Sequence, residues 1–151
     1  MGSELVIRTA VADDLPELQR IFEAAALSNV DDAPVLRAHP EFLIFAGDGI
    51  ADGRTRVAVS GDDRVLGFAT VALVDGVPEL EDLFVDPEFH RRGVARGLMH
   101  DAVTTARAAG HRRMTVVGNS HALDFYRAVG FVETGPASTE LGTGIRMRLD
   151  L

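Results

Sequence analysis

The sequence predicts a mixed α/β fold in which one sheet carries helices on its faces. Two observations lead to this prediction. Some segments repeat apolar residues at helical spacing, whereas others alternate or form short apolar runs bounded by Gly-Asp or Asp-Gly turns. The segments also come in a telling order: strand and helix, a meander of three strands, helix, strand, helix and two final strands. A meander followed by alternating strands and helices is typical of a mixed sheet with helices packed against it.

The N-terminal third predicts one strand and one clear helix. Residues 5–9 form a short strand, and Asp13 and Asp14 then suit the N-terminus of a helix. The apolar residues of that helix are Leu15, Leu18, Ile21, Phe22 and Ala25. Residues 28–53 are less regular. Pro34 suits a first helical turn there, and the glycines that follow indicate an irregular connection.

The middle of the chain predicts the three-strand meander. Val57 and Val59 alternate with polar or small residues, and a turn at 61–64 leads into an apolar run over 65–74. A second turn, Asp75-Gly76, precedes a strand over Glu79–Val85 that ends at Asp86-Pro87.

The C-terminal half predicts two helices and three strands. A helix of residues 93–109 ends well at Gly110, and a buried strand follows at 114–117. A second helix is expected over 119–129, with Asn119 or Ser120 as its cap and Gly130 at its end. The last two strands are expected at 131–133 and 145–149.

Composition limits the function classes. The net charge is −8, all 15 basic residues are arginine, and there is no cysteine, which excludes disulfides and thiolate chemistry by the protein. An acidic chain is a poor nucleic-acid binder, and no apolar run reaches the ~20 residues of a membrane span. Residues 1–4 lack the basic start of a secretory segment. We therefore expect one cytoplasmic domain over 1–151, with neither a membrane nor a nucleic acid as partner.

The histidines predict no metal site and no hydrolytic triad. His90, His100, His111 and His121 match no metal-ligand spacing. Ser120, His121 and Asp124 lack a nucleophile elbow and lie too close together along one helical turn.

The start of the helix at 93–109 is a candidate anion site. A helix N-terminus carries unpaired N–H groups and positive dipole charge, and small residues let an anion approach that backbone. The small residues are Gly93, Ala95 and Gly97, flanked by the arginines Arg91, Arg92 and Arg96. The pattern suits a pyrophosphate, although a tight turn with solvated arginines would give the same residues.

Two segments resemble the GCN5-related N-acetyltransferase (GNAT) family. They are Leu83–Pro87 with the glycine-rich turn after it, and Asn119–Phe131, which is similar to the family's Asn-x-x-Ala-x-x-Phe-Tyr-x-x-x-Gly-Phe pattern. His90 departs from the Gln or Arg that opens the family's phosphate loop. The resemblance implies the GNAT acyl-CoA N-acyltransferase fold: a mixed, mainly antiparallel central sheet flanked by helices and splayed between its fourth and fifth strands.

The resemblance also implies a cosubstrate, acetyl-CoA, and the residues that bind it. The strand-edge residues Leu83, Phe84 and Val85 would meet the acetyl carbonyl and pantetheine arm. The pyrophosphate site and its helix start would be formed by Arg91, Arg92, Gly93, Val94, Ala95, Arg96 and Gly97. Asn119 would cap its helix and also contact coenzyme A.

Tyr126, the only tyrosine, is the expected general acid. In the family this tyrosine lies near the thioester sulfur, and a phenol can protonate a thiolate at neutral pH. A tyrosine packed in the core for structure is the alternative. Glu81 is the first candidate for the base, followed by Glu79, with Asp82 or water also open. In an unbroken strand, Glu79 and Glu81 would share a face with Leu83, opposite Asp82.

The sequence therefore predicts an N-acetyltransferase that acetylates a primary amine of a small molecule or peptide. The alternative is a non-catalytic acyl-CoA-binding sensor or partner module. We expect the acceptor region at 26–43 and 137–144, where Asn29, Asp31 and Asp32 would receive a cationic amine or simply form a solvated loop. By resemblance, the second tail strand would also serve a homodimer.

Overall fold

The computed structural model describes residues 5–139 and 142–151. Residues 1–4, where we expected no secretory segment, and residues 140–141, inside the expected acceptor tail, lie outside the described residues. The strands are β1 (Val6–Thr9), β2 (Thr55–Val59), β3 (Val65–Val74), β4 (Val77–Val85), β5 (Arg113–Gly118), β6 (Val132–Thr139) and β7 (Gly142–Asp150). The helices are α1 (Leu15–Leu27), α2 (Ala33–Ala38), α3 (Asp48–Ala51), α4 (Val94–Ala108) and α5 (Leu123–Val129).

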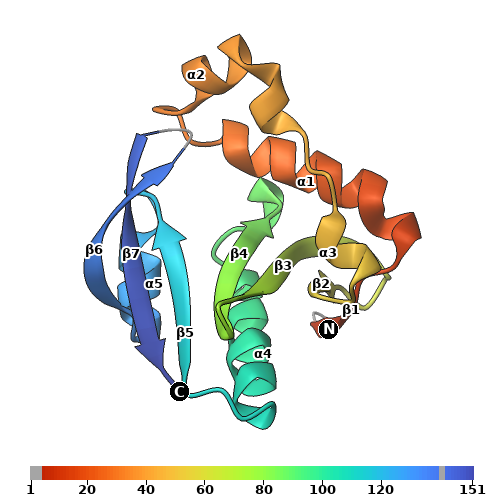
Figure 1. Cartoon of the computed structure of the whole chain (residues 1–151). Helices are drawn as coiled ribbons and strands as arrows, with labels where there is room; N and C mark the ends of the chain where they lie inside the picture. Colours follow the sequence, from red (N-terminus) through yellow and green to blue (C-terminus); the bar gives the residue numbers. More distant parts are fainter. Residues whose placement is uncertain (1–4, 140–141) are drawn as a thin grey trace.

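The strands form one sheet in the order β1-β2-β3-β4-β5-β7-β6. Neighbours are antiparallel except β4 and β5, which are parallel and pair only through Glu79↔Thr115 and Leu80↔Val116. Beyond Leu80 the two strands separate toward α2 (Figure 1). The predicted fold class, with its splay between the fourth and fifth strands, is confirmed.

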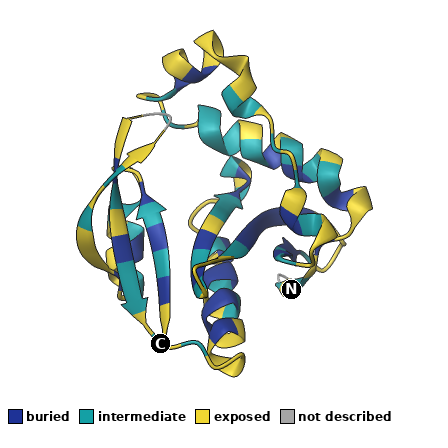
Figure 2. Ribbon diagram, in the orientation of Figure 1, coloured by how far each residue is buried: buried dark blue, intermediate teal, exposed yellow. Residues whose placement is uncertain are grey.

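Helices cover both faces of the sheet. On β2, Val57 and Val59 pack in a cluster with Leu18 and Ile21 of α1, whereas Ala58 belongs to the cluster around α4 and α5. This alternation follows from the two-residue period of a strand. Buried positions concentrate on β2, β3 and α4, as Figure 2 shows for β3 and α4. No helix among the described residues has the length and apolar character needed to cross a bilayer.

Four predicted elements have wrong boundaries. The helix expected from Asn119 begins at Leu123, because the Asn119 side chain holds the preceding residues in a turn. The tail strands expected at 131–133 and 145–149 are longer, and they pair with each other along their length as β6 and β7. The strand expected from Glu79 begins at Val77.

β4 contains a bulge, which changes the expected faces. Asp82 pairs with Thr70 and Leu80 with Val71, so Glu81 has no partner in the register with β3. As a result Leu80 lies on the same side as Leu83, in the α4 cluster, although an unbroken strand would put them on opposite sides. The expectation that Glu79 and Leu83 share a face is therefore wrong.

Candidate functional site

The N-terminus of α4 presents backbone N–H groups that lack partners. Its N-cap is Gly93, with no side-chain capping bond, and the first amide bonded back to the cap is that of Gly97, at 2.9 Å from the Gly93 carbonyl. Within the described chain, the amides of Val94, Ala95 and Arg96 have no acceptor. Together with the helix dipole, these amides form a site suited to an anion.

Gly93 allows close approach to these amides. Its φ of 82° lies in the left-handed region, and nothing lies within 4 Å of the position that a Cβ would occupy. Arg91 also has a positive φ, 65°, which is uncommon for a residue with a side chain. The turn thus exposes backbone on its outer side.

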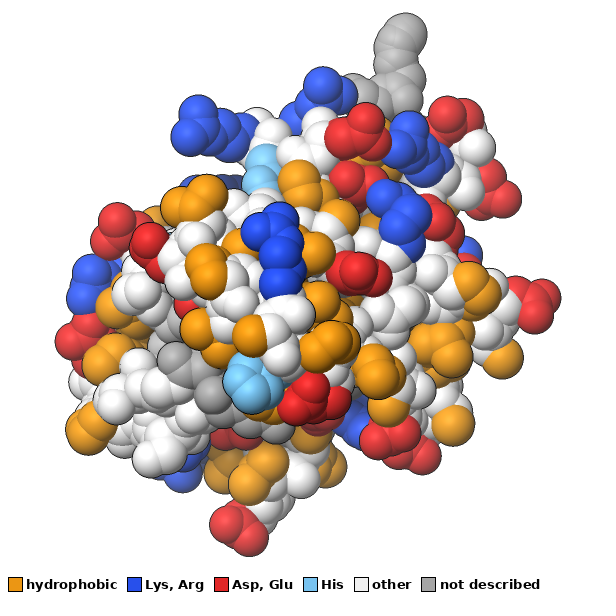
Figure 3. Space-filling model, turned by 90° about the horizontal axis from the view of Figure 1, so that it is seen from above, with side chains coloured by type: hydrophobic (Ala, Val, Ile, Leu, Met, Phe, Trp, Pro, Cys, Tyr) orange, Lys and Arg blue, Asp and Glu red, His pale blue; other side chains and the backbone are white. Residues whose placement is uncertain are grey.

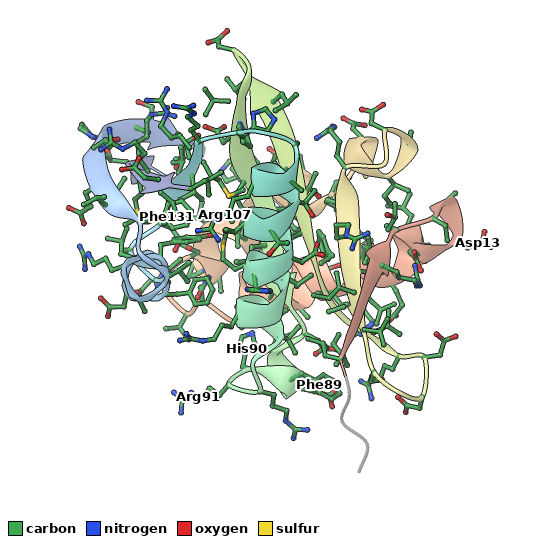
Figure 4. All side chains as sticks on the ribbon, turned by 90° about the horizontal axis from the view of Figure 1, so that it is seen from below. Asp13, Phe89, His90, Arg91, Arg107 and Phe131 are labelled. Carbon is green, nitrogen blue, oxygen red and sulfur yellow. The ribbon has the colours of Figure 1, made fainter. Side chains whose placement is uncertain are left out.

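The side chains around this turn divide into two groups. Arg91, Arg96 and His90 line a cavity in front of the helix. Arg92, expected beside them, instead lies over the Phe89 ring, with 5.4 Å from its guanidinium carbon to the ring centre, and does not line the cavity. Figure 4 shows Phe89, His90 and Arg91 together below the start of α4.

Gly97 has a packing role. A Cβ on Gly97 would come within 2.9 Å of the Leu5 side chain, so the small residue lets α4 pack against the residue before β1. Gly97 is absent from the cavity lining.

The end of β4 forms the second wall of the cavity. Leu83, Phe84 and Val85 line it. They pair with β3 on one side, and none of them pairs with β5 on the other. His90 approaches this edge, with its Nε2 at 3.1 Å from the Val85 carbonyl oxygen. The β5-facing edge of residues 83–85 is therefore available to a ligand that enters the splay.

Tyr126 forms the third wall, from α5. Its ring is buried, packs edge-on against Phe131 with 5.5 Å between centroids, and lies close to Gly118 of β5. Burial raises the pKa of Tyr126 to about 12, so the phenol keeps its proton at neutral pH. None of the described residues makes a hydrogen bond with its hydroxyl, and Tyr126 lines the cavity.

Asn119 organises the turn before α5. Its side-chain oxygen accepts the amides of His121 at 3.0 Å and Ala122 at 3.1 Å. Asn119 also lines the cavity. The expected place beside the ligand is compatible with this position, but the expected helix cap is wrong, because the N-cap of α5 is Ala122 and no side chain caps it.

The three acids of β4 lie outside the cavity lining. Glu81, at the bulge, is exposed and forms a 3.5 Å ion pair with Arg54. The Glu79 carboxylate accepts a hydrogen bond from Thr115 at 3.2 Å and one from Arg146 at 3.3 Å. Asp82 is partly buried. Burial raises its pKa, although a hydrogen bond from Thr70 opposes the shift.

These walls enclose a cavity of about 700 Å³. No acidic residue lines it among the described residues, in a chain whose net charge is −8. Ser28 and Asn29 line it from the expected acceptor region, and several other lining residues were not predicted: Ala25, Phe89, His90, His121, Ala122 and Phe125. Ala25, near the end of α1, carries no sequence pattern that would have indicated it, whereas His90 and Phe89 adjoin the predicted turn.

A polar contact joins the two sides of the cavity. His121, in the turn before α5, lies 3.5 Å from Asp32, which precedes α2. Of the expected acceptor residues, Asn29 lines the cavity and Asp31 is exposed. Val30 and Ile44 are also exposed, by 80% and 69%. Seen from above, hydrophobic side chains lie among charged ones over this end of the molecule (Figure 3).

In residues 5–139 and 142–151, no group of three or more histidine or acidic side chains could hold a metal ion.

A family model described as the Acetyltransferase (GNAT) family matches residues 16–131. The chain belongs to the GNAT family of acetyltransferases. The match spans the three walls of the cavity, from α1 through the α4 turn to Tyr126 and Phe131. The chain therefore carries an acyltransferase domain of the kind that uses acetyl-CoA.

Three known proteins are similar to this GNAT chain, one in sequence and two in fold. It is 39% identical over 114 residues to the streptothricin acetyltransferase of Streptomyces lavendulae, a match over 69% of this chain and 60% of that protein. The chain thus spans less than two thirds of that relative.

Two solved structures share the fold. A GCN5-related N-acetyltransferase from Rhodopseudomonas palustris has a TM-score of 0.78 at 20% identity and covers 100% of this chain and 98% of its own. The PaiA N-acetyltransferase from Thermoplasma acidophilum, solved with coenzyme A, has a TM-score of 0.75 at 16% identity and covers 98% of this chain and 99% of its own.

Proposed function

We propose that this chain transfers an acetyl group from acetyl-CoA to a primary amine by direct attack of the amine on the thioester. One observation carries the proposal: a single cavity is lined by the uncapped start of α4, the end of β4 and Tyr126. Phosphate binding needs the start of α4, thioester placement needs the end of β4, and proton donation needs Tyr126. A module that only binds acyl-CoA would not need the tyrosine.

The α4 turn is suited to the diphosphate of the cosubstrate. Its free amides, with Arg91 and Arg96, offer donors and positive charge, and no described acid lines the cavity to oppose them. The β5-facing edge of Leu83 and Val85 would hold the pantetheine arm and polarise the acetyl carbonyl.

The reaction needs two proton transfers. The amine nitrogen forms a bond to the acetyl carbon while the carbon–sulfur bond breaks. The amine gives up a proton to a base, and the coenzyme A thiolate takes one from the Tyr126 hydroxyl. Tyr126 fits the acid role because it lines the cavity and carries its proton at neutral pH, although burial, by raising its pKa, also makes the phenol a weaker donor. Glu81, Glu79 or Asp82 serves as the base, directly or through water.

The test is release of coenzyme A thiol from acetyl-CoA across a panel of amino acids, peptides, polyamines and aminoglycosides. Streptothricin belongs in the panel because a relative is named for it. Acceptor-dependent release supports the transferase. Tight acetyl-CoA binding by calorimetry with no release for any acceptor would favour the binding module.

A further inference from the structure

A second hollow, of about 320 Å³, lies at the closed end of the gap between β4 and β5. Its lining includes Glu79 of β4, Thr115 of β5, and Arg146 and Arg148 of β7. Ile145, Met147 and Leu149 of β7 pack in the core beneath α5. Because side chains alternate along a strand, the two arginines project from the face of the sheet turned away from α5.

The arginines of this hollow have unused hydrogen-bond donors. Arg146 reaches Glu79 at 3.3 Å. The Nε of Arg148 is shielded from solvent without a hydrogen-bond partner, and Asp150 lies 3.4 Å from it. Arg113, also in the lining, forms no ion pair within the described chain. Each guanidinium carries several N–H donors in a fixed fork, so these contacts leave most of them free.

The hollow also differs in charge from the protein as a whole. Its lining holds three arginines and two acids, Asp75 and Glu79, and a third acid, Asp150, pairs with Arg148, in a chain of net charge −8. Arginine forks match carboxylate and phosphate groups through paired hydrogen bonds. An anion is therefore the class of ligand that these donors suit.

The hollow and the large cavity share one face of β4. Along that face lie Glu79, in the hollow, then Asp82, then Phe84, which lines the cavity and packs in the α1 cluster. At the rise of a strand, these positions place the hollow on the order of 10 Å from the cavity. One extended molecule can occupy both.

We propose that the arginine hollow (Arg113, Arg146 and Arg148) binds a carboxylate or phosphate of the acceptor, whose amine lies on the order of 10 Å away, about the length of an extended tripeptide. This inference rests on the proposed acetyl transfer and names its acceptor class: amines with a distant anionic group. It differs from the cationic acceptors that Asp31 and Asp32 would favour.

The experiment compares acceptors that differ only in the anion. Initial rates of acetylation are measured for triglycine against triglycinamide, and for 6-aminohexyl phosphate against 6-aminohexanol. We expect kcat/KM to be about tenfold or more higher for the anionic member of at least one pair, and which pair responds identifies a carboxylate or a phosphate. In Arg113→Gln/Arg148→Gln that ratio should fall toward one. Arg107→Gln, on an exposed turn of α4, should keep the ratio.

Equal rates within both pairs, while other amines are acetylated, would overturn the inference and leave the transferase intact. A second measurement needs no activity: inorganic phosphate and, separately, acetate are titrated while backbone amides of β5 and β7 are followed by NMR. Shifts that disappear in the double variant support the hollow, and an absence of shifts with both anions in the unmodified protein overturns it. Failure of every acceptor would instead count against the proposed transfer.

Discussion

Arg20 of α1 donates a hydrogen bond of 2.9 Å to Asp86, the residue at which the chain leaves β4 for the α4 turn. Asp86 is only 2% exposed, and its other oxygen accepts the Glu88 amide at 3.1 Å. Because α1 lines one side of the cavity and β4 another, this pair connects two of its walls.

Asp86 should make the protein sensitive to acid. Burial disfavours its charged form, but the bonds from Arg20 and the Glu88 amide outweigh burial and keep the pKa of Asp86 below its usual value. Because the pKa of Asp86 is lower in the folded protein than in the unfolded chain, its charged carboxylate stabilises the fold fully above pH ~4. This stabilisation is lost as pH falls through the native pKa. Asp86→Asn should therefore lower the free energy of unfolding by about 2 kcal/mol at neutral pH and weaken its acid dependence. Urea denaturation across this pH range measures both, with exposed Asp124→Asn as the control.

Tyr126→Phe should separate binding from turnover. The variant keeps the buried ring and its contact with Phe131 but loses the proton, so kcat should fall by ~100-fold or more. Acetyl-CoA affinity, measured by calorimetry, should stay within about twofold. A matching loss of affinity and rate would mean that the tyrosine supports the cavity wall and is not the acid.

Gly93→Ala should weaken acetyl-CoA binding, whereas Gly110→Ala, at the other end of α4, should not. Gly93 and Gly110 flank α4, both have positive φ (82° and 90°), and nothing lies within 4 Å of a Cβ at either position. Each alanine should cost about 1 kcal/mol of stability through backbone strain. Only the Cβ at Gly93 would stand before the free amides, so only that variant should lose acetyl-CoA affinity in calorimetry. Equal affinities for the two variants would argue against a diphosphate at the turn.

The features that the sequence predicted depend on residues that lie close together along the chain. Helical and strand periods, with turns such as Asp75-Gly76, determine element type, and Gly93 indicates the helix start because few other residues adopt its φ. These depend on neighbours along the chain. The order of elements and the α4 turn were therefore predictable, and the splay followed from the family resemblance.

Contacts between distant segments explain what the sequence missed. The bulge at Glu81 depends on the register with β3, which no pattern within β4 reveals. Arg92 lies over the Phe89 ring, and the glycine-rich pattern around it does not indicate which way its side chain turns. The end of α1 enters the lining through packing across the sheet, so Asn29 could be placed near an acceptor but not beside the α4 turn.

The pH dependence of kcat/KM should identify the base among the acids of β4. Glu81 is exposed and paired with Arg54, and Glu79 is held by Thr115 and Arg146, whereas burial raises the pKa of Asp82 and makes its carboxylate a stronger proton acceptor than a solvated aspartate. We therefore expect Asp82→Asn to lower kcat/KM by ~100-fold and remove the acid limb of the profile, which for the unmodified enzyme should lie above pH ~4. Glu81→Gln is the matched control and should change the rate by less than about threefold. If Glu81→Gln produced the larger loss, the bulge residue would be the base, and if neither variant moved the acid limb, Glu79 or water would accept the proton.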